Sequence, residues 1–148
     1  MHLIRIERSH VFETSLERGF AVITDPANWP SFWPGLVRIA PESRWAAPGD
    51  EARLVTRLLG RDVELRMTVH QFVPKQLVTY TSAQEGLPDA RHERHFRRVG
   101  DGFEFRIVVV YEPRPGRRGI LDRSVVRRGV DRAVRQTLRN LEDLLGSA

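Results

Sequence analysis

The sequence predicts an α+β fold in which a curved, seven-stranded antiparallel sheet wraps a long C-terminal helix, with two short helices after the first strand. Six alternating apolar and polar runs between residues 36 and 112, separated by turn-forming residues, are typical of an antiparallel meander. From about residue 119 the apolar residues recur at helical spacing up to residue 145. One helix is narrower than such a sheet, so we expect a cavity beneath it.

The composition favours a single domain over residues 1–148. Its length and an apolar fraction of 41% suffice for a sizeable core, and the absence of cysteine excludes disulfides and thiolate chemistry. There is no stretch of 18 uncharged apolar residues, and the first residues lack the apolar core of a signal peptide. We therefore expect a cytoplasmic protein without a transmembrane segment, present as a monomer or a homodimer.

The charge of the chain suggests an anionic partner, because the formal net charge is +5. However, only Lys75 among the 24 basic residues is lysine, and the aromatic residues lie mostly apart from the arginines. Proteins that bind single-stranded nucleic acid instead interleave aromatic and basic side chains on one face. Nucleic-acid or protein interaction through the basic surface is therefore the least favoured of the functions considered.

The N-terminal elements follow from residue spacing. Residues 2–12 alternate loosely between apolar and polar side chains, which predicts a strand. Thr14 and Glu17 have the spacing of a capping box, so a first helix should begin there. Its apolar stripe continues to about Thr24.

The segment DPANWPSFWPGL, residues 25–36, predicts a second, short helix. Asp25 offers an N-cap carboxylate, and Pro26 suits a first helical turn because it needs no N–H partner. Pro30 and Pro34 should each push the preceding tryptophan out of the helical region, so we expect this helix to end quickly. The two tryptophans would then wedge the short helices against the end of the sheet.

Six further strands are expected from the period-two pattern, with one apolar and one mostly polar face each. They cover residues 36–45, 51–59, 63–72, 76–82, 90–99 and 103–112. A tight turn at Asp101–Gly102 should join the last two strands.

The helix predicted over residues 119–145 has one apolar stripe and one basic face. The stripe consists of Val126, Val130, Val134, Leu138, Leu141 and Leu145, and the basic face of Arg128, Arg132, Arg135 and Arg139. We expect the arginines to be solvated; the alternative is contact with an anionic membrane or an acidic partner. Gly129 beside Ala133 allows close approach of the sheet or a ligand, although ordinary helix packing explains it equally well.

The chain resembles the START-like (SRPBCC) superfamily with the helix-grip fold, of which a birch pollen allergen is the familiar example. Within it the chain is similar to the polyketide cyclase/dehydrase and lipid-transport group. The resemblance rests on SHVFETSLERGFAVITDPANWPSFWPGLVRI, VHQFVPKQLVTYTS and RNLEDLL, and it extends over nearly the whole chain. It implies a ligand cavity between the sheet and the C-terminal helix, while leaving the ligand open, because members bind lipids, sterols, polyketides, quinones or plant hormones.

Familiar catalytic signatures are absent from the sequence. It contains no G-x-S-x-G, no H-E-x-x-H and no G-x-x-x-x-G-K-[ST] motif. His92 and His95 lie three residues apart in a predicted strand, so they should point to opposite faces and cannot jointly bind a metal. We predict no metal site and no cofactor.

Two polar residues are candidates for chemistry in the cavity. If Phe96 faces the core, then His92 and Arg94 on the same strand face it too. Because a buried charge is costly without a partner, we expect both groups to reach solvent at the open end of the strand. In the alternative they meet a polar ligand group, with Arg94 as its anchor and His92 as a proton-transfer residue.

The predicted function is binding of a small, mostly apolar ligand that is lipid-, quinone- or polyketide-like. The alternative is an enzyme of the cyclase, aromatase or dehydratase type that acts on such a ligand. The expected cavity residues, from the apolar faces of the elements, are Trp33, Leu65, Met67, Tyr80, Phe96, Phe105, Ile107, Val109, Tyr111, Val126, Val130 and Val134. The tyrosines serve either as ligand contacts through their hydroxyls or as plain core residues.

Overall fold

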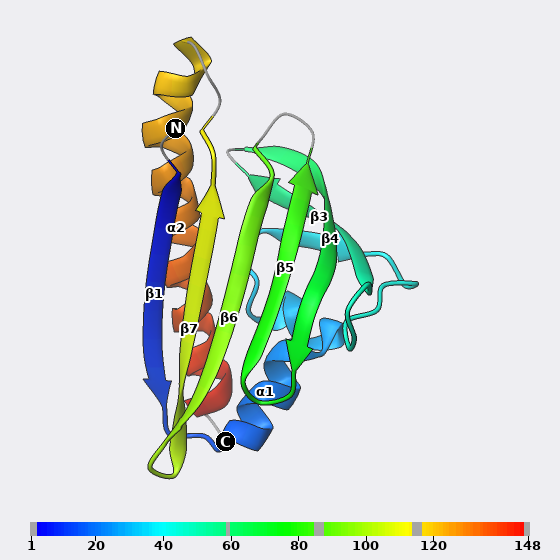
Figure 1. Ribbon diagram of the computed structural model, residues 1–148, viewed down its shortest axis with the longest axis vertical. Helices are drawn as coiled ribbons and strands as arrows, with labels where there is room; N and C mark the ends of the chain where they lie inside the picture. Colours follow the sequence, from blue (N-terminus) through cyan, green and yellow to red (C-terminus); the bar gives the residue numbers. More distant parts are fainter. Residues whose placement is uncertain (1–2, 59, 85–87, 114–116, 147–148) are drawn as a thin grey trace.

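The computed structural model describes residues 3–58, 60–84, 88–113 and 117–146, and it confirms the predicted architecture. One antiparallel sheet packs against the long helix α2 (Arg117–Gly146), which runs behind β1, β7 and β6 in Figure 1. The strands of the described part are β1 (Ile4–Phe12), β2 (Leu36–Ile39), β3 (Glu51–Leu58), β4 (Arg61–Val73), β5 (Leu77–Gln84), β6 (Ala90–Val99) and β7 (Gly102–Tyr111). Their order in the sheet is β1-β7-β6-β5-β4-β3-β2.

The first helix, α1 (Leu16–Thr24), begins one residue later than a capping box at Thr14 requires. Ser15 is the N-cap, because its Oγ accepts a hydrogen bond from the N–H of Arg18 at 3.2 Å. The predicted box between Thr14 and Glu17 is therefore wrong. Thr14 instead donates its hydroxyl to the carbonyl oxygen of Leu145 at 2.8 Å, which ties the start of α1 to the end of α2.

The second helix, η1 (Pro26–Ser31), is a 3₁₀ helix with the predicted cap. Asp25 accepts a hydrogen bond from the N–H of Ala27 at 3.0 Å, and Pro26 occupies the first turn. The expectation that Pro30 ends the helix is wrong, since Pro30 lies inside it. The fixed φ of proline is compatible with the 3₁₀ geometry, which continues for one more residue.

The tryptophans of this corner pack against one another. Trp29 is fully buried, and its Nε1 donates to the carbonyl oxygen of Ile23 at 3.0 Å. Its ring centroid lies 5.6 Å from that of Trp33 and 5.3 Å from that of Trp45. Trp29 is thus a core residue that holds η1 in place, while Trp33 is only partly buried.

Two of the predicted boundaries need correction. The second strand ends at Ile39 and not at residue 45, and the loop that follows is closed by Asp50, which accepts from the N–H groups of Ala46 and Ala47. The β6–β7 turn lies at residues 100–101, because Gly102 already pairs with Val99 as the first residue of β7. Gly100 adopts φ +57°, the left-handed conformation that the turn requires.

The two halves of the sheet's inner face are covered differently. Near the β6–β7 hairpin, where Figure 1 shows α1, the ring of Phe20 packs edge-on against Phe96 with centroids 4.9 Å apart. The C-terminal half of α2 buries Leu138, Leu141 and Leu145 there. Nearer its N-terminus, α2 presents Val126 and Val130, which are only partly buried, so this part of the sheet is less completely filled.

Candidate ligand-binding cavity

A cavity of about 170 Å³ lies between the inner face of the sheet and α2. Strands β3 to β7 contribute to its walls, Trp33 and Pro34 close one side, and residues 126–137 of α2 cover it. The corner after η1 therefore places one tryptophan in the cavity wall and the other, Trp29, in the core.

Most of the residues expected from the sequence surround this cavity. Its wall includes Trp33, Leu65, Tyr80, Ile107, Val109, Tyr111, Val126, Val130 and Val134. Met67, Phe96 and Phe105 also face inward and are buried, but they do not line it. Phe96 and Phe105 stack with centroids 5.0 Å apart in the half of the sheet that α1 covers, so their expected position in the cavity wall is wrong.

The sequence interpretation missed several wall residues. They are Pro34, Thr56, Ser82, Gln84, Pro88, Ala90 and Thr137, while Ala133, named above for a close approach of sheet or ligand, is also in the wall. Period-two alternation starting from Tyr80 would have found Ser82 and Gln84, and helical spacing from Val130 would have found Thr137. These residues are polar or small, and a search for large apolar side chains passes over them.

Arg94 points into the cavity and does not reach solvent, which corrects the expectation that it does. Its relative exposure is 8%, and its Cζ lies 5.8 Å from the ring centroid of Trp33 and 5.4 Å from that of Tyr80. Such aromatic faces attract a cation. Its Nε is buried and forms no hydrogen bond.

His92 occupies the same wall, two residues earlier on β6. Its ring stacks on that of Tyr80, with centroids 4.4 Å apart and an interplanar angle of 4°, and its Nε2 lies 2.9 Å from the Oγ of Ser82. Burial, with a smaller contribution from the positive charge of Arg94, lowers the pKa of His92 from 6.5 to about 3. The imidazole is therefore neutral at neutral pH.

Two hydroxyl groups complete the polar part of the wall. Burial raises the pKa of Tyr80 above its ordinary value, and the nearby Arg94 only partly opposes that rise, so the phenol stays neutral. The hydroxyl of Thr56 is buried in the wall and forms no hydrogen bond. Among the described wall residues, neutral donors and acceptors therefore surround the guanidinium of Arg94.

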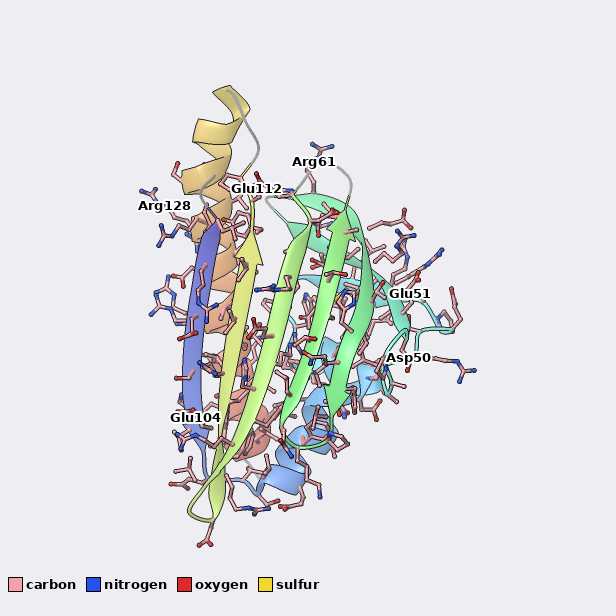
Figure 2. The ribbon with its side chains drawn as sticks, viewed as in Figure 1. Asp50, Glu51, Arg61, Glu104, Glu112 and Arg128 are labelled. Atoms are coloured by element: carbon pink, nitrogen blue, oxygen red, sulfur yellow. The ribbon has the colours of Figure 1, made fainter. Side chains whose placement is uncertain are left out.

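The carboxylates lie elsewhere, as the alternation predicts. Figure 2 shows Glu51 and Glu104 pointing away from the interior, and Arg128 at the outside of α2. Glu93, on the outer face of β6, lies 2.8 Å from His95, and this hydrogen bond lowers the pKa of Glu93. His92 and His95 thus lie on opposite faces, as expected from their spacing.

The described ranges show neither a metal-ligand cluster nor a membrane-spanning helix. Those residues contain no group of three or more histidine and acidic side chains that could hold a metal ion. Within the same ranges, no helix is long and apolar enough to cross a membrane.

Comparisons with known proteins agree with this geometry. The sequence model of the family described as polyketide cyclase/dehydrase and lipid transport matches residues 4–146. No curated protein matches the sequence. Among solved structures, the Zhui aromatase/cyclase from Streptomyces sp. R1128 aligns with a TM-score of 0.83 at 12% identity, over 99% of this chain and 93% of its own.

Two further structures show the same fold. A START superfamily protein from Mycobacterium smegmatis has a TM-score of 0.78 at 12% identity, over 97% of each chain. The protein TTHA0849 from Thermus thermophilus has a TM-score of 0.79 at 18% identity, over 99% of this chain and 98% of its own. At such identities the likeness establishes the fold, and the family match extends over nearly the entire sequence. The chain therefore belongs to the polyketide cyclase/dehydrase and lipid transport family.

Proposed function

We propose that the protein binds a small, mostly apolar molecule in the cavity between the sheet and α2. The observation that carries this proposal is the cavity itself, whose wall is mostly aliphatic, proline and aromatic side chains with several convergent polar groups. Such a wall is the usual composition of a small-molecule site, because apolar burial supplies affinity and the polar groups fix orientation. Lipid-, quinone- and polyketide-like molecules share this chemistry.

The cavity volume limits how much of a ligand is enclosed. Pockets for drug-sized ligands usually measure roughly 300–1,000 Å³, whereas an apolar cavity of about 150 Å³ accepts benzene. The 170 Å³ found here therefore accommodates one ring or a short chain. A larger ligand requires α2 to move away from the sheet, and Val126 and Val130 of this helix are only partly buried against the core.

A pair of valines on α2 allows a direct test. Val130 lines the cavity, whereas Val125 lies outside it and is 47% exposed. Val130→Trp should fill the cavity and weaken binding of the uncharged single-ring probe toluene about tenfold or more, since most of the buried apolar contact is lost. Val125→Trp should bind toluene like the wild type, as measured by calorimetry.

The binding proposal fails if the wild type takes up no probe, or if both tryptophan variants bind it equally. Native mass spectrometry of the purified protein provides an independent readout, because a retained small molecule should be displaced by the same probe.

A second candidate is a cyclase/aromatase-type enzyme, which is favoured by the polar cluster of His92, Ser82 and Arg94 inside an apolar cavity. A histidine with a pKa near 3 is a weak base at neutral pH, so binding is the better-supported function. If turnover occurs, His92→Ala and Arg94→Ala should abolish water loss from a linear poly-β-ketone thioester while circular dichroism stays native. Unchanged turnover in both variants would exclude these residues as the catalytic groups.

A further inference from the structure

The starting observation is the contrast between Arg94 and the other arginines of β6. Arg91, Arg97 and Arg98 are exposed, and each forms an ion pair with a glutamate. Arg94 is the buried one, and none of the ion pairs between described residues includes it. On this strand, the exposed arginines are therefore paired with glutamates, while the buried Arg94 is in no ion pair between described residues.

The described residues of the cavity wall offer no internal counter-ion for this guanidinium. No aspartate or glutamate is among the described residues of the wall, and the nearest ionisable groups, His92 and Tyr80, are both neutral. The rings of Trp33 and Tyr80 offset part of the desolvation cost through their faces, but a ring carries no net negative charge. A buried charge is costly unless it is paired, so the site is electrostatically incomplete without an anion.

The hydrogen-bonding capacity of Arg94 leads to the same conclusion. A guanidinium has five N–H donors in a planar fork that matches a carboxylate, and the Nε of Arg94 forms no hydrogen bond. The buried hydroxyl of Thr56 and the Ser82–His92 pair belong to the same wall. An acidic group in this cavity would find both a charge and polar neighbours.

From these observations, and resting on the proposed function, we propose that the ligand is an apolar molecule with a single negative charge, a carboxylic acid, whose carboxylate pairs with Arg94. Because Arg94 is the one guanidinium among the described wall residues, we expect the ligand to carry one negative charge. The remaining wall of valines, isoleucine and aromatic rings takes the apolar body. A phosphate monoester fits less well, because its second charge has no partner among the described wall residues.

The test compares ligands of one length that differ only in their polar end. Calorimetry should show that the wild type binds octanoate about tenfold or more tightly than octanol or octanamide. The reason is that a hydrogen bond between Arg94 and a carboxylate is stronger than one between Arg94 and a neutral hydroxyl or amide. Octyl phosphate should bind more weakly than octanoate. The preference for octanoate should persist at high salt, since a buried pair is screened much less than a surface arginine is.

Two variants separate Arg94 from the general basic charge of the protein. Arg94→Met keeps the length of the side chain without its charge, so it should bind octanol as the wild type does and lose the preference for octanoate. Arg97→Met removes an exposed arginine of the same strand and should retain the preference. Arg94→Lys keeps the charge without the planar fork and should fall between wild type and Arg94→Met.

The outcomes distinguish this inference from the proposed function. Equal binding of octanoate and octanol by the wild type, or an octanoate preference that survives in Arg94→Met, overturns the acidic ligand while leaving the cavity as a binding site. Tighter binding of octyl phosphate than of octanoate overturns the choice of a carboxylate. Failure of the wild type to bind any of the four compounds overturns both proposals.

Discussion

His92 illustrates how a single environment decides the state of a titratable residue. The ring lies flat on Tyr80, its Nε2 meets Ser82, and Arg94 is two residues away on the same strand. All three neighbours are compatible with a neutral imidazole, and Arg94 opposes a charged one. The lowered pKa is therefore a property of the assembled wall, because the cause that contributes most to it is burial.

This pKa makes stability depend on pH. Between pH 6.5 and about 3 the unfolded chain protonates this imidazole and the folded chain does not, so acidification favours unfolding across that window. The wild type should lose up to about 1.4 kcal/mol per pH unit more than His92→Gln, which retains hydrogen-bonding capacity toward Ser82. Urea unfolding at pH 7 and pH 5 measures the difference. The matched control is His70→Gln, which replaces an exposed histidine beside Thr81. The stability of this control should change with pH as that of the wild type does. The same pH dependence in all three proteins would contradict the role of His92.

At this scale the sequence predicted the direction of side chains better than their surroundings. The alternation in β6 placed His92 and Arg94 on the inner face correctly, since a strand has only two faces. It could not predict that Arg94 is buried, because that depends on Trp33, which is distant in sequence and reaches the cavity through the turn after η1.

Among the elements, α1 owes its position to a close approach at Gly19. A Cβ placed on Gly19 would lie 2.2 Å from two ring atoms of Phe103. That ring is fully buried and stacks on Phe12 with centroids 5.1 Å apart, so it has little space to move. Glycine is required here by packing and not by backbone conformation.

Gly19→Ala should consequently destabilise the protein by about 1–3 kcal/mol through overpacking, although alanine favours an isolated helix by about 1 kcal/mol. Gly146→Ala is the control, because the nearest atom to its added Cβ is a side-chain oxygen of Glu142 at an ordinary 3.5 Å. This control should leave stability unchanged or raise it slightly. Chemical denaturation of both variants checks the comparison, and a stable Gly19→Ala protein would show that α1 can shift on the sheet.

The order and type of the elements were predictable, whereas their ends were less so. Period-two and helical patterns identified all seven strands and α2, because each element has one apolar face. The errors came from local chemistry: Ser15 caps α1 in place of Thr14, and Pro30 fits inside a 3₁₀ helix. At the start of α1 two neighbouring residues could serve as the cap, and the tertiary contact of Thr14 with Leu145 decided between them. In η1 the 3₁₀ geometry tolerates the fixed φ of Pro30.

For the whole molecule, the sheet has one filled half and one hollow half. The aromatic side chains under α1 fill the first, and the small residues of α2 leave the second open. The sequence predicted a cavity from the mismatch between one helix and a wide sheet, but it placed Phe96 and Phe105 in the cavity wall, because alternation alone does not show which end of the sheet α1 covers.

Filling the hollow half should stabilise the entire fold. A ligand that binds only the native state raises the free energy of unfolding by about 2.7 kcal/mol when its concentration is 100 times its dissociation constant. Octanoate should therefore raise the unfolding midpoint of the wild type, as measured by thermal denaturation, and should leave Val130→Trp unchanged. An equal shift in both proteins would locate the bound octanoate outside the cavity.

The pairing of β1 with β7 has a consequence for how the chain folds. Hairpins join consecutive strands from β2 to β7, so this meander can assemble from contacts that are local in sequence. In contrast, Ile4 pairs with Tyr111 and Phe12 with Phe103, so β1 gains its neighbour only after about a hundred further residues have been synthesised. We therefore expect β1 and α2 to dock late, in a step slowed by the entropy of closing that long loop. The wall that depends on α2 then forms last, and a nascent chain acquires its cavity only when its fold is complete.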